Sequence, residues 1–423
     1  MTVQEYLNEN TSAFKEIKAI NTVFEPFGLS IDEVIKGAQI VRYKIKLPYD
    51  VKAQGKIRRA EKDIEYTLST ALQTNDIIYG KESDFVYVEK KSTFEPVMFE
   101  DSIFNLPEKG LYLLLGKDLD GKNTYTNLSK APHILVGGTT GSGKSELLHA
   151  FIASLIMRRE KNPCQLILID PKRAEFSVYK NRNGIDLITD MSEASKKLSW
   201  AVDLMEERYK TLEQNKCKDI YELNDPNMYP YVIIVDELAD LMMQERDAEK
   251  YIIRLAQKAR ACGIHLILGT QSPRRDVITG LIKSNIPTKI ALHTTSQMES
   301  RIILDKGGAE KLFGKGDMLY LGNGAFNPIR IQSSYISQEM KEKIANALSY
   351  EEHKEAAFQK TDITSDELKA NIKAETGWDF DNAVARYKVS DAPIKKKKKV
   401  GLLKALLSVK PIMFRTDDYP PKI

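Results

Sequence analysis

The sequence is poor in cysteine and has no long apolar run. Its 423 residues include three cysteines, Cys164, Cys217 and Cys262, which lie far apart and form no CxxC or Cys/His metal-binding spacing. This pattern predicts reduced thiols in a cytoplasmic setting, without a disulfide or a structural zinc site. No apolar stretch approaches the roughly 18 to 20 residues that span a bilayer, and the polar start lacks a signal-peptide core. We therefore expect an unprocessed cytoplasmic chain that does not cross a membrane.

The chain also lacks a strong charge of one sign. Lysine and arginine together number 63 and aspartate and glutamate 59, which leaves a net charge of +4. Any basic surface must therefore be local. One basic run is KKKKK at 395–399, followed by VGLLKALLSVK. This tail is a candidate for binding DNA, an anionic membrane surface or an unidentified partner, and the alternative is a solvated linker before a small helix.

Short apolar runs alternate with amphipathic segments through the middle of the chain. The runs are HILV, QLILI, YVIIV, HLILG and KIAL, at 133–136, 165–169, 231–235, 265–269 and 289–292. Their spacing is typical of strands joined by helices. Residues 105–340 are thus predicted to form an α/β domain with a mostly parallel sheet covered on both faces.

The flanking segments have a different composition. Residues 1–27 are predicted to be a helical N-terminal extension, and residues 28–104 a small α+β domain. Within that domain, residues 39–47 alternate apolar with basic side chains, as in a half-buried strand, before a segment with helical spacing and a second strand. Residues 341–423 turn polar and are predicted to be a helical C-terminal extension that ends in the basic tail.

The segment HILVGGTTGSGKSELLHAFIASLI, residues 133–156, places four glycines within seven positions, before a lysine and a serine. It satisfies G-x-x-x-x-G-K-[ST] between a predicted strand and a predicted helix, the context that the motif requires. Glycines let backbone N–H groups turn inward around phosphate oxygens, and the helix N-terminus is positive. The alternative, a flexible Gly/Ser turn, does not account for the flanking strand and helix. The predicted ATP-binding residues are Gly138, Thr139, Thr140, Gly141, Ser142, Gly143, Lys144, Ser145 and Glu146, of which Lys144 is expected to reach the β and γ phosphates and Ser145 to bind Mg²⁺.

Two acids follow the apolar run 231–235. Asp236 is placed to hold the magnesium shell, and Glu237 to accept a proton from the attacking water. The alternative for Glu237 is an acid that simply begins a helix. Thr270 and Gln271 follow another run, where a polar side chain can sense the γ phosphate or orient the water; the alternative is a helix cap or turn. We predict Lys144, Asp236, Glu237 and Gln271 to be catalytic.

An additional predicted strand, 165–169, lies between the glycine loop and the acid-bearing strand in the chain. An extra strand that separates the lysine strand from the aspartate strand resembles RecA-like ATPases. Further segments resemble the motor domain of FtsK/SpoIIIE DNA translocases, almost continuously from about Leu111 to Ile331. Besides the glycine loop they are LILIDPKRAEFSVY, TDMSEASKKLSWAVDLMEERYK, IIVDELADLMM, RLAQKARACGIHLILGTQSPRRDVITGLIKSNIPTKIAL and SRIILDKGGAEKLFGKGDMLYLG. Residues 28–100 resemble, more weakly, the small domain that precedes the motor in that family.

The resemblance implies a hexameric ring that encircles double-stranded DNA and moves along it by hydrolysing ATP. In such a ring a neighbouring subunit completes the active site. By its position in AQKARACGIH, Arg260 matches the arginine that reaches the adjacent subunit's nucleotide, where it would neutralise charge on the γ phosphate. The alternative is a surface cation near a helix C-terminus.

A motor that moves along any sequence must contact DNA phosphates and not base edges. The candidates are Arg274, Arg275, Lys283 and Arg301, and solvated surface charge is the alternative for each. The chain departs from the family pattern at Ser272, where arginine is usual, and at Gln297, where lysine is common. Arg274 and Arg275 are placed to compensate.

The family's membrane-spanning N-terminal region and its winged-helix reader of orienting DNA sequences are not recognisable in this sequence. We therefore expect a soluble DNA-pumping ATPase. A coupling or secretion ATPase that feeds protein or single-stranded DNA to a membrane channel is the alternative, and a module that uses ATP only as a switch is a third. The intact Lys144, Asp236, Glu237 and Gln271 disfavour the switch, since a switch does not need the water-activating acid.

Overall fold

A computed structural model of the chain describes residues 1–10, 13–82 and 84–348. Nearly all of the predicted C-terminal extension, including the basic run at 395–399, lies outside these residues. Within them no helix combines the length and the apolar character that crossing a membrane requires.

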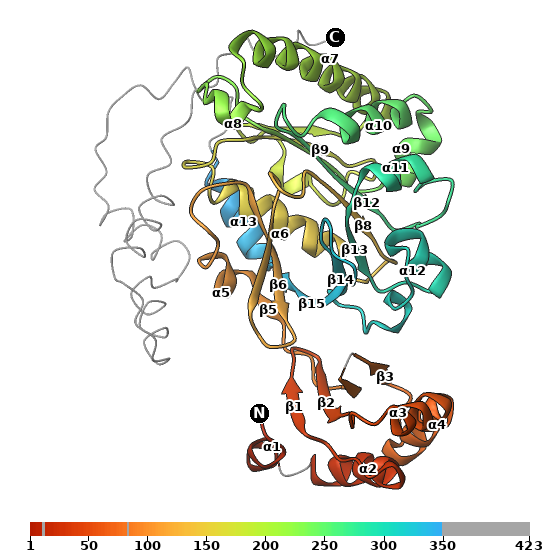
Figure 1. Ribbon diagram of the computed structural model, residues 1–423. Helices are drawn as coiled ribbons and strands as arrows, with labels where there is room; N and C mark the ends of the chain where they lie inside the picture. The colour runs from red at the N-terminus through yellow and green to blue at the C-terminus, as the bar shows by residue number, and fades with distance from the viewer. Residues whose placement is uncertain (11–12, 83, 349–423) are drawn as a thin grey trace, which may run out of the picture.

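The N-terminal unit, red to orange in Figure 1, is a small antiparallel sheet packed against helices. Its strands follow the order β1–β2–β4–β3, with bounds Glu33–Lys36, Ile40–Lys46, Phe85–Lys91 and Ile77–Lys81. Its helices are α1 (Val3–Glu9), α2 (Phe14–Phe24), α3 (Val51–Arg59) and α4 (Glu61–Leu72), with a short 3₁₀ turn at Glu25–Phe27. One apolar core joins Ile20 and Phe24 of α2 to Tyr43 and Ile45 of β2. The division between residues 1–27 and 28–104 remains a prediction.

The larger unit is built on one long sheet in the order β10–β9–β11–β12–β8–β13–β14–β15–β6–β7, with β5 paired to β15. The first six strands are mutually parallel, which confirms the predicted mostly parallel core. Their bounds are Ile185–Ile188, Gln165–Ile169, Tyr231–Val235, Ile264–Thr270, His133–Gly137 and Thr288–Leu292. The remaining strands pair antiparallel, apart from β5, with bounds Asp317–Leu321, Ile329–Tyr335, Tyr112–Asp118, Asn123–Asn127 and, for β5, Val97–Met98.

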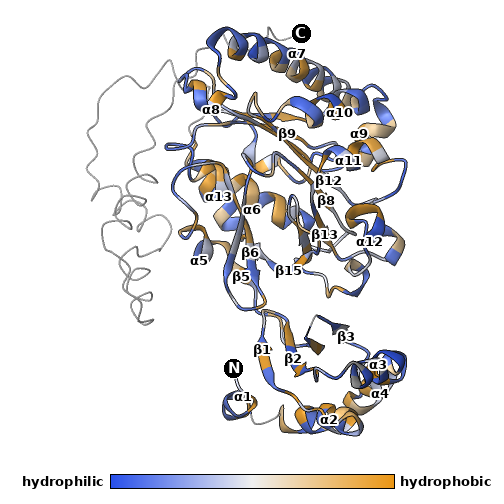
Figure 2. Cartoon of the chain, in the orientation of Figure 1, coloured by the Kyte–Doolittle hydropathy of each residue, from blue (hydrophilic) through white to orange (hydrophobic). Residues whose placement is uncertain are grey.

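Helices cover both faces of this sheet (Figure 1). On one face lie α5 (Phe99–Ile103), α6 (Lys144–Ile156) and α13 (Gln338–Asn346); on the other lie α7 (Met191–Asn215), α9 (Leu238–Gln244), α10 (Ala248–Lys258), α11 (Gly280–Asn285) and α12 (Gln297–Leu304). Short elements are α8 (Ile220–Leu223) and 3₁₀ turns at Ser177–Tyr179 and Ala309–Lys311. Figure 2 shows apolar strands between helices with polar outer faces. Along β8, Ile134 and Val136 join one core, whereas Leu135 joins the other.

The strand order corrects one detail of the sequence prediction. A single strand does separate the lysine strand β8 from the aspartate strand β11, as expected, but that strand is β12. The run 165–169, predicted for this position, forms β9 on the far side of β11. Strands β8, β9 and β12 are all mainly apolar and buried along their whole length, so their composition does not distinguish a central position from a neighbouring one.

A buried charge network joins the two units. Glu89 of β4 accepts hydrogen bonds from Arg42 of β2 and from Arg330 of β15, and its side chain is 1% exposed. Arg330 also donates to both carboxylate oxygens of Asp317, over 2.8 and 2.6 Å. Burial alone lowers the pKa of Arg330, but the hydrogen bonds that Arg330 donates to Asp317 and the charges of Asp317 and Glu89 outweigh burial and raise that pKa. The contact between the units therefore includes an ionic network that is shielded from water.

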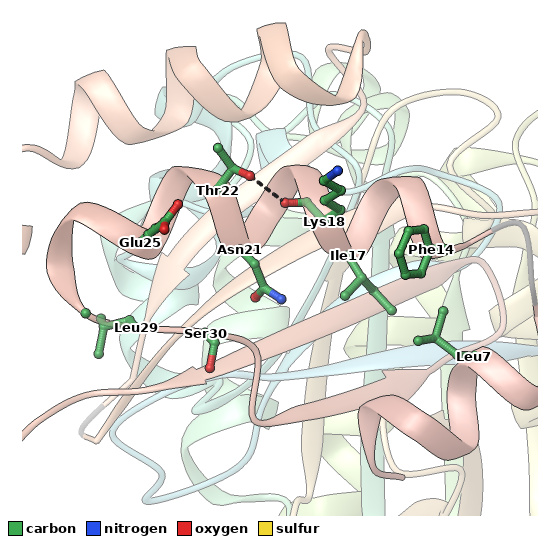
Figure 3. A pocket seen from close by; sticks show the side chains of 10 residues that line it. Leu7, Phe14, Ile17, Lys18, Asn21, Thr22, Glu25, Leu29 and Ser30 are labelled. Atoms are coloured by element: carbon green, nitrogen blue, oxygen red, sulfur yellow. Dashed lines mark hydrogen bonds between the residues drawn. The ribbon is translucent and has the colours of Figure 1, made fainter.

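A cavity of about 600 Å³ lies within the N-terminal unit, between α1, α2 and the segment that leads into β1 (Figure 3). Leu7, Ile17 and Leu29 line it together with the polar Asn21 and Glu25. The Asn21 amide oxygen accepts a hydrogen bond from the Ile31 N–H, so this side chain already stabilises the wall. None of the lining residues belongs to the glycine loop, so the cavity is not part of the predicted nucleotide site.

Candidate nucleotide-binding site

The glycine loop connects the C-terminal end of β8 to the N-terminal end of α6. Gly143 is the N-cap of α6 and has φ +102°, a left-handed conformation that favours glycine. A Cβ atom at Gly143 would also lie 2.5 Å from the backbone nitrogen of Gly316. Both the backbone angle and the close neighbour therefore require glycine at this position.

Hydrogen bonds to three other segments of the chain brace the loop. The Thr139 N–H and hydroxyl both donate to the His293 carbonyl, which follows β13. The Gly316 N–H donates to the Ser142 carbonyl over 2.7 Å. The Thr140 hydroxyl donates to the Gln271 side-chain oxygen over 2.9 Å. The loop is thus fixed in shape before any ligand arrives, as a phosphate-binding loop needs to be.

Lys144 and Asp236 form a buried ion pair at the centre of the site. The Lys144 ammonium donates to the Asp236 carboxylate over 2.5 Å and to the Asp236 carbonyl over 2.6 Å. The two side chains are 2% and 0% exposed. Lys144 and Asp236, the residue directly after β11, therefore meet although one strand separates β8 from β11.

The donor set fits a magnesium ion. Asp236 Oδ2 is buried and has no hydrogen-bond partner in the described part of the chain. Ser145 follows Lys144 in the first turn of α6 and offers a hydroxyl as a second oxygen ligand. A carboxylate and a hydroxyl are the oxygen ligands that Mg²⁺ accepts while it keeps several waters. We therefore expect Ser145 and Asp236 to hold the ion.

Glu237 and Gln271 lie side by side at the same edge of the sheet. The backbone N–H of Gln271 donates to Glu237 Oε2 over 2.9 Å, while the Gln271 side chain contacts Thr140. Glu237 is also the N-cap of α9, because its Oε1 accepts from the Ala239 N–H. Glu237 thus begins helix α9, which was the alternative to a catalytic function. The same position is compatible with a function as the catalytic base.

Glu146 differs from the other predicted loop residues. Its Oε1 pairs with the Lys341 ammonium of α13 over 2.8 Å. Its place among the nucleotide-binding residues remains a prediction.

Arg260 lies at the opposite edge of the sheet from the glycine loop. Arg260 lies four positions before Ile264, the first residue of β12, and Gln271 directly follows Thr270, the last residue. The seven residues of β12 span roughly 20 Å. Its guanidinium is exposed and donates to the Ser129 carbonyl, ahead of β8. Arg260 therefore does not reach the site of its own chain.

The predicted DNA contacts occupy different environments. Arg274 and Arg275 are exposed on the segment after β12; Arg274 pairs with Asp276 over 3.4 Å, and Arg275 lies 4.0 Å from the Met298 sulfur of α12. Arg301 is exposed on the same helix. These three arginines follow or flank the strand ends nearest the glycine loop.

Lys283, by contrast, stabilises the packing of two helices. Its ammonium donates to the Arg301 carbonyl over 2.7 Å and pairs with Asp305 over 2.6 Å, and its side chain is 17% exposed. Partial burial opposes ionisation of Asp305, but hydrogen bonds from Lys283 and Lys289 prevail and lower its pKa. A DNA phosphate would have to compete with both contacts.

Two features near the site were not predicted. The Lys172 ammonium, in the loop after β9, lies 3.9 Å from the Glu237 carboxylate. The turn at 314–317 contacts the glycine loop through Gly316. Lys172 follows the apolar run 165–169 by three residues, so its place near a strand end was visible in the sequence. The turn gives no comparable signal, because Gly316 and Ser142 are 174 positions apart in the chain.

A model of the FtsK/SpoIIIE family matches residues 98–229 and 224–275, the part of the chain that contains this site. Residues 98–275 belong to the FtsK/SpoIIIE family. The proteins called DNA translocase FtsK of Bacillus cereus and Clostridium acetobutylicum are 36% and 39% identical to this chain, over 88% and 81% of its length. The alignments cover 49% and 46% of those relatives, so the chain spans about half of their length.

Solved structures of P-loop ATPases share the fold. The pCW3 conjugation coupling protein TcpA, determined with ATPγS, is 24% identical, with a TM-score of 0.56 over 78% of this chain and 99% of that one. The cytoplasmic domain of the Thermomonospora curvata type VII secretion ATPase EccC is 22% identical, with a TM-score of 0.52 over 60% of this chain and 34% of that one. These two likenesses bear on the fold alone, which is the predicted RecA-like α/β architecture.

Proposed function

We propose that this chain is an ATPase motor that moves double-stranded DNA through a ring of identical subunits, six by the family resemblance. One observation supports this proposal most strongly. Lys144, Asp236 and Glu237 meet beside a braced glycine loop, and Gln271 contacts both that loop and Glu237. A loop that only binds nucleotide does not need a buried acid at this position.

The residues have separate functions in hydrolysis. Lys144 leaves Asp236 to bind the β and γ phosphates, and Ser145 and Asp236 hold Mg²⁺, which neutralises charge on the phosphate oxygens when bound. Glu237 accepts a proton from the attacking water. Gln271 orients that water or senses the γ phosphate through the same side chain that now contacts Thr140.

The position of Arg260 supports completion of the site by a neighbouring subunit. Arginine stabilises charge on a transferring phosphoryl group, but this arginine lies roughly 20 Å from the loop of its own chain. If the sheet edge that carries the glycine loop in one subunit packed against the Arg260 edge of the next subunit, Arg260 would lie beside the neighbour's glycine loop. A ring is the closed form of such a head-to-tail contact.

Arg274, Arg275 and Arg301 are the proposed DNA phosphate contacts, with Lys283 as a weaker candidate because its ammonium already has two partners. The names of the 36–39% identical relatives favour duplex DNA over the coupling or secretion alternative. ATP and Mg²⁺ are abundant in the cytoplasm, the proposed location.

ATP hydrolysis by the full chain, measured without DNA, with single-stranded DNA and with duplex, tests the proposal. We expect duplex to stimulate turnover most and the protein to displace a third strand from a duplex in an ATP-dependent manner. Equal stimulation by both DNA forms, or a preference for single strands, would favour the coupling alternative. Electron microscopy with duplex and a nonhydrolysable ATP analogue then tests the ring.

A further inference from the structure

The Glu237 carboxylate is held by donors from two elements. The Thr270 hydroxyl donates to Oε1 over 2.7 Å, and the Gln271 N–H donates to Oε2 over 2.9 Å. The Ala239 N–H of α9 adds a longer contact of 3.3 Å to Oε1. The side chain is 3% exposed, so these donors replace water around both oxygens.

Thr270, like its neighbour Gln271, connects Glu237 to the glycine loop. Its hydroxyl contacts Glu237, and its carbonyl accepts from the Gly138 N–H over 3.2 Å. In the sheet it pairs with Gly137, the last residue of β8. One fully buried residue therefore fixes the carboxylate relative to the loop that would hold the phosphates.

Lys172 supports the same carboxylate less strongly. Its ammonium is 3.9 Å from Oε2, beyond hydrogen-bond distance, and its side chain is 48% exposed. Solvent screens such a contact, whereas the Thr270 hydrogen bond is fully buried. The hydroxyl therefore dominates.

We propose that Thr270 is the positioning residue for Glu237: its hydroxyl keeps the carboxylate in register with the glycine loop, with Lys172 as a minor electrostatic support. The inference rests on the proposed ATPase function. A base must lie within hydrogen-bond reach of the proton that it removes, and a small displacement costs rate without weakening substrate binding. A purely structural function for Thr270 would instead change stability and nucleotide affinity together.

Thr270→Val removes the hydroxyl and keeps the shape of the side chain, and Thr270→Ser keeps the hydroxyl. We expect Thr270→Val to lower kcat by about 10-fold or more, with KM and the Kd of an ATP analogue within about twofold. Thr270→Ser should stay within about threefold of the parent protein, and Lys172→Met should lower kcat less than Thr270→Val does. Thr288→Val is the matched control, because Thr288 is equally buried in β13 and its hydroxyl has no partner in the described residues.

Hydrogen exchange of the Gln271 amide gives a readout that does not depend on turnover. This N–H donates to Glu237, so Thr270→Val should speed its exchange in the nucleotide-free protein, and Thr288→Val should not. An unchanged kcat in Thr270→Val, or equal losses in the Val and Ser variants, would overturn the proposal. A parent protein that does not hydrolyse ATP would contradict the proposed function, while the exchange measurement would still report how Glu237 is held.

Discussion

Lys144 donates to the carbonyl and to the carboxylate of Asp236, so the lysine expected to bind phosphate is engaged by the acid expected to bind magnesium. Both side chains are buried, and each compensates the charge of the other. Nucleotide binding must therefore exchange one set of charge partners for another. Neither charge is left without a partner in this exchange. Lys144 would pair with phosphate instead of Asp236, and Asp236 would pair with Mg²⁺ instead of Lys144.

Lys144→Ala should abolish tight nucleotide binding and also destabilise the nucleotide-free protein. Removing one partner of a buried ion pair leaves an uncompensated charge, which lowers the free energy of unfolding by about 3–5 kcal/mol. Thermal and denaturant unfolding measure this loss. Adding Asp236→Asn should restore much of the stability but no binding; additive losses in the double variant would contradict the pairing. Lys250→Ala, which breaks an exposed pair with Asp247, is the control.

Glu237→Gln should bind the ATP analogue with nearly unchanged affinity and lower turnover by about 100-fold or more, because the amide cannot accept the proton from water. Single-turnover hydrolysis and analogue titration separate the two effects. Retained turnover would remove Glu237 from its assignment as base.

Arg260→Ala should stop turnover and be partly rescued in mixed assemblies with Glu237→Gln subunits. In such mixtures an intact Glu237 site can adjoin a subunit with an intact Arg260, so some sites are complete. Turnover measured against the mixing ratio should pass through a maximum, whereas a flat, inactive series would contradict action between subunits. Arg254→Ala is a suitable control, since Arg254 lies on α10 and pairs with Glu206 within the chain.

The double substitution Arg274→Ala and Arg275→Ala should weaken DNA binding and make it less dependent on salt. Each lost phosphate contact reduces the slope of log K against log salt concentration by about 0.9 for duplex DNA. Binding titrations at several salt concentrations give this slope. An unchanged slope would exclude both arginines from the DNA path. The control is the double substitution Lys196→Ala and Lys210→Ala, which removes two exposed lysines of α7.

Glu89→Gln should loosen the N-terminal unit from the rest of the chain. The substitution leaves Arg330 and Arg42 buried with one compensating charge fewer, at a cost of about 3–5 kcal/mol. Differential scanning calorimetry should show an earlier transition for this unit. Glu95→Gln, which alters an exposed pair with Lys36, should change stability by at most about 1 kcal/mol; similar effects of the two would refute the buried network.

The sequence predicted the parallel half of the sheet because its strands are short apolar runs bounded by turns. It did not predict the antiparallel half equally well. Strand β7, NTYTN, is the last strand of the sheet, is only partly buried and has no apolar pattern. Strand β15 lies inside the sheet but contains the polar residues Gln332, Ser333 and Ser334, of which both serines are buried. The order of the parallel strands also depends on crossovers that composition does not encode.

Within the site, residues that belong to local motifs were predicted, and contacts between distant segments were not. Asp236 and Gln271 follow apolar runs, and Lys144 follows the glycine loop that comes after another such run, so their common edge was deducible. Arg42 shows the limit. Its strand was interpreted as having one apolar and one basic face, yet Arg42 is buried, because Glu89 lies opposite it on β4.

The turn at 314–317 contacts both the glycine loop and the charge network between the units. The Gly316 N–H donates to the Ser142 carbonyl. The Asp317 carboxylate accepts from Arg330, which also pairs with Glu89. Separating the N-terminal unit from the larger unit would expose the charges of Glu89, Arg330 and Asp317 to water at the same time. The connection between the two units is therefore stiff against small forces. Mechanical load applied there would be transmitted to the backbone of the loop over a path only a few residues long.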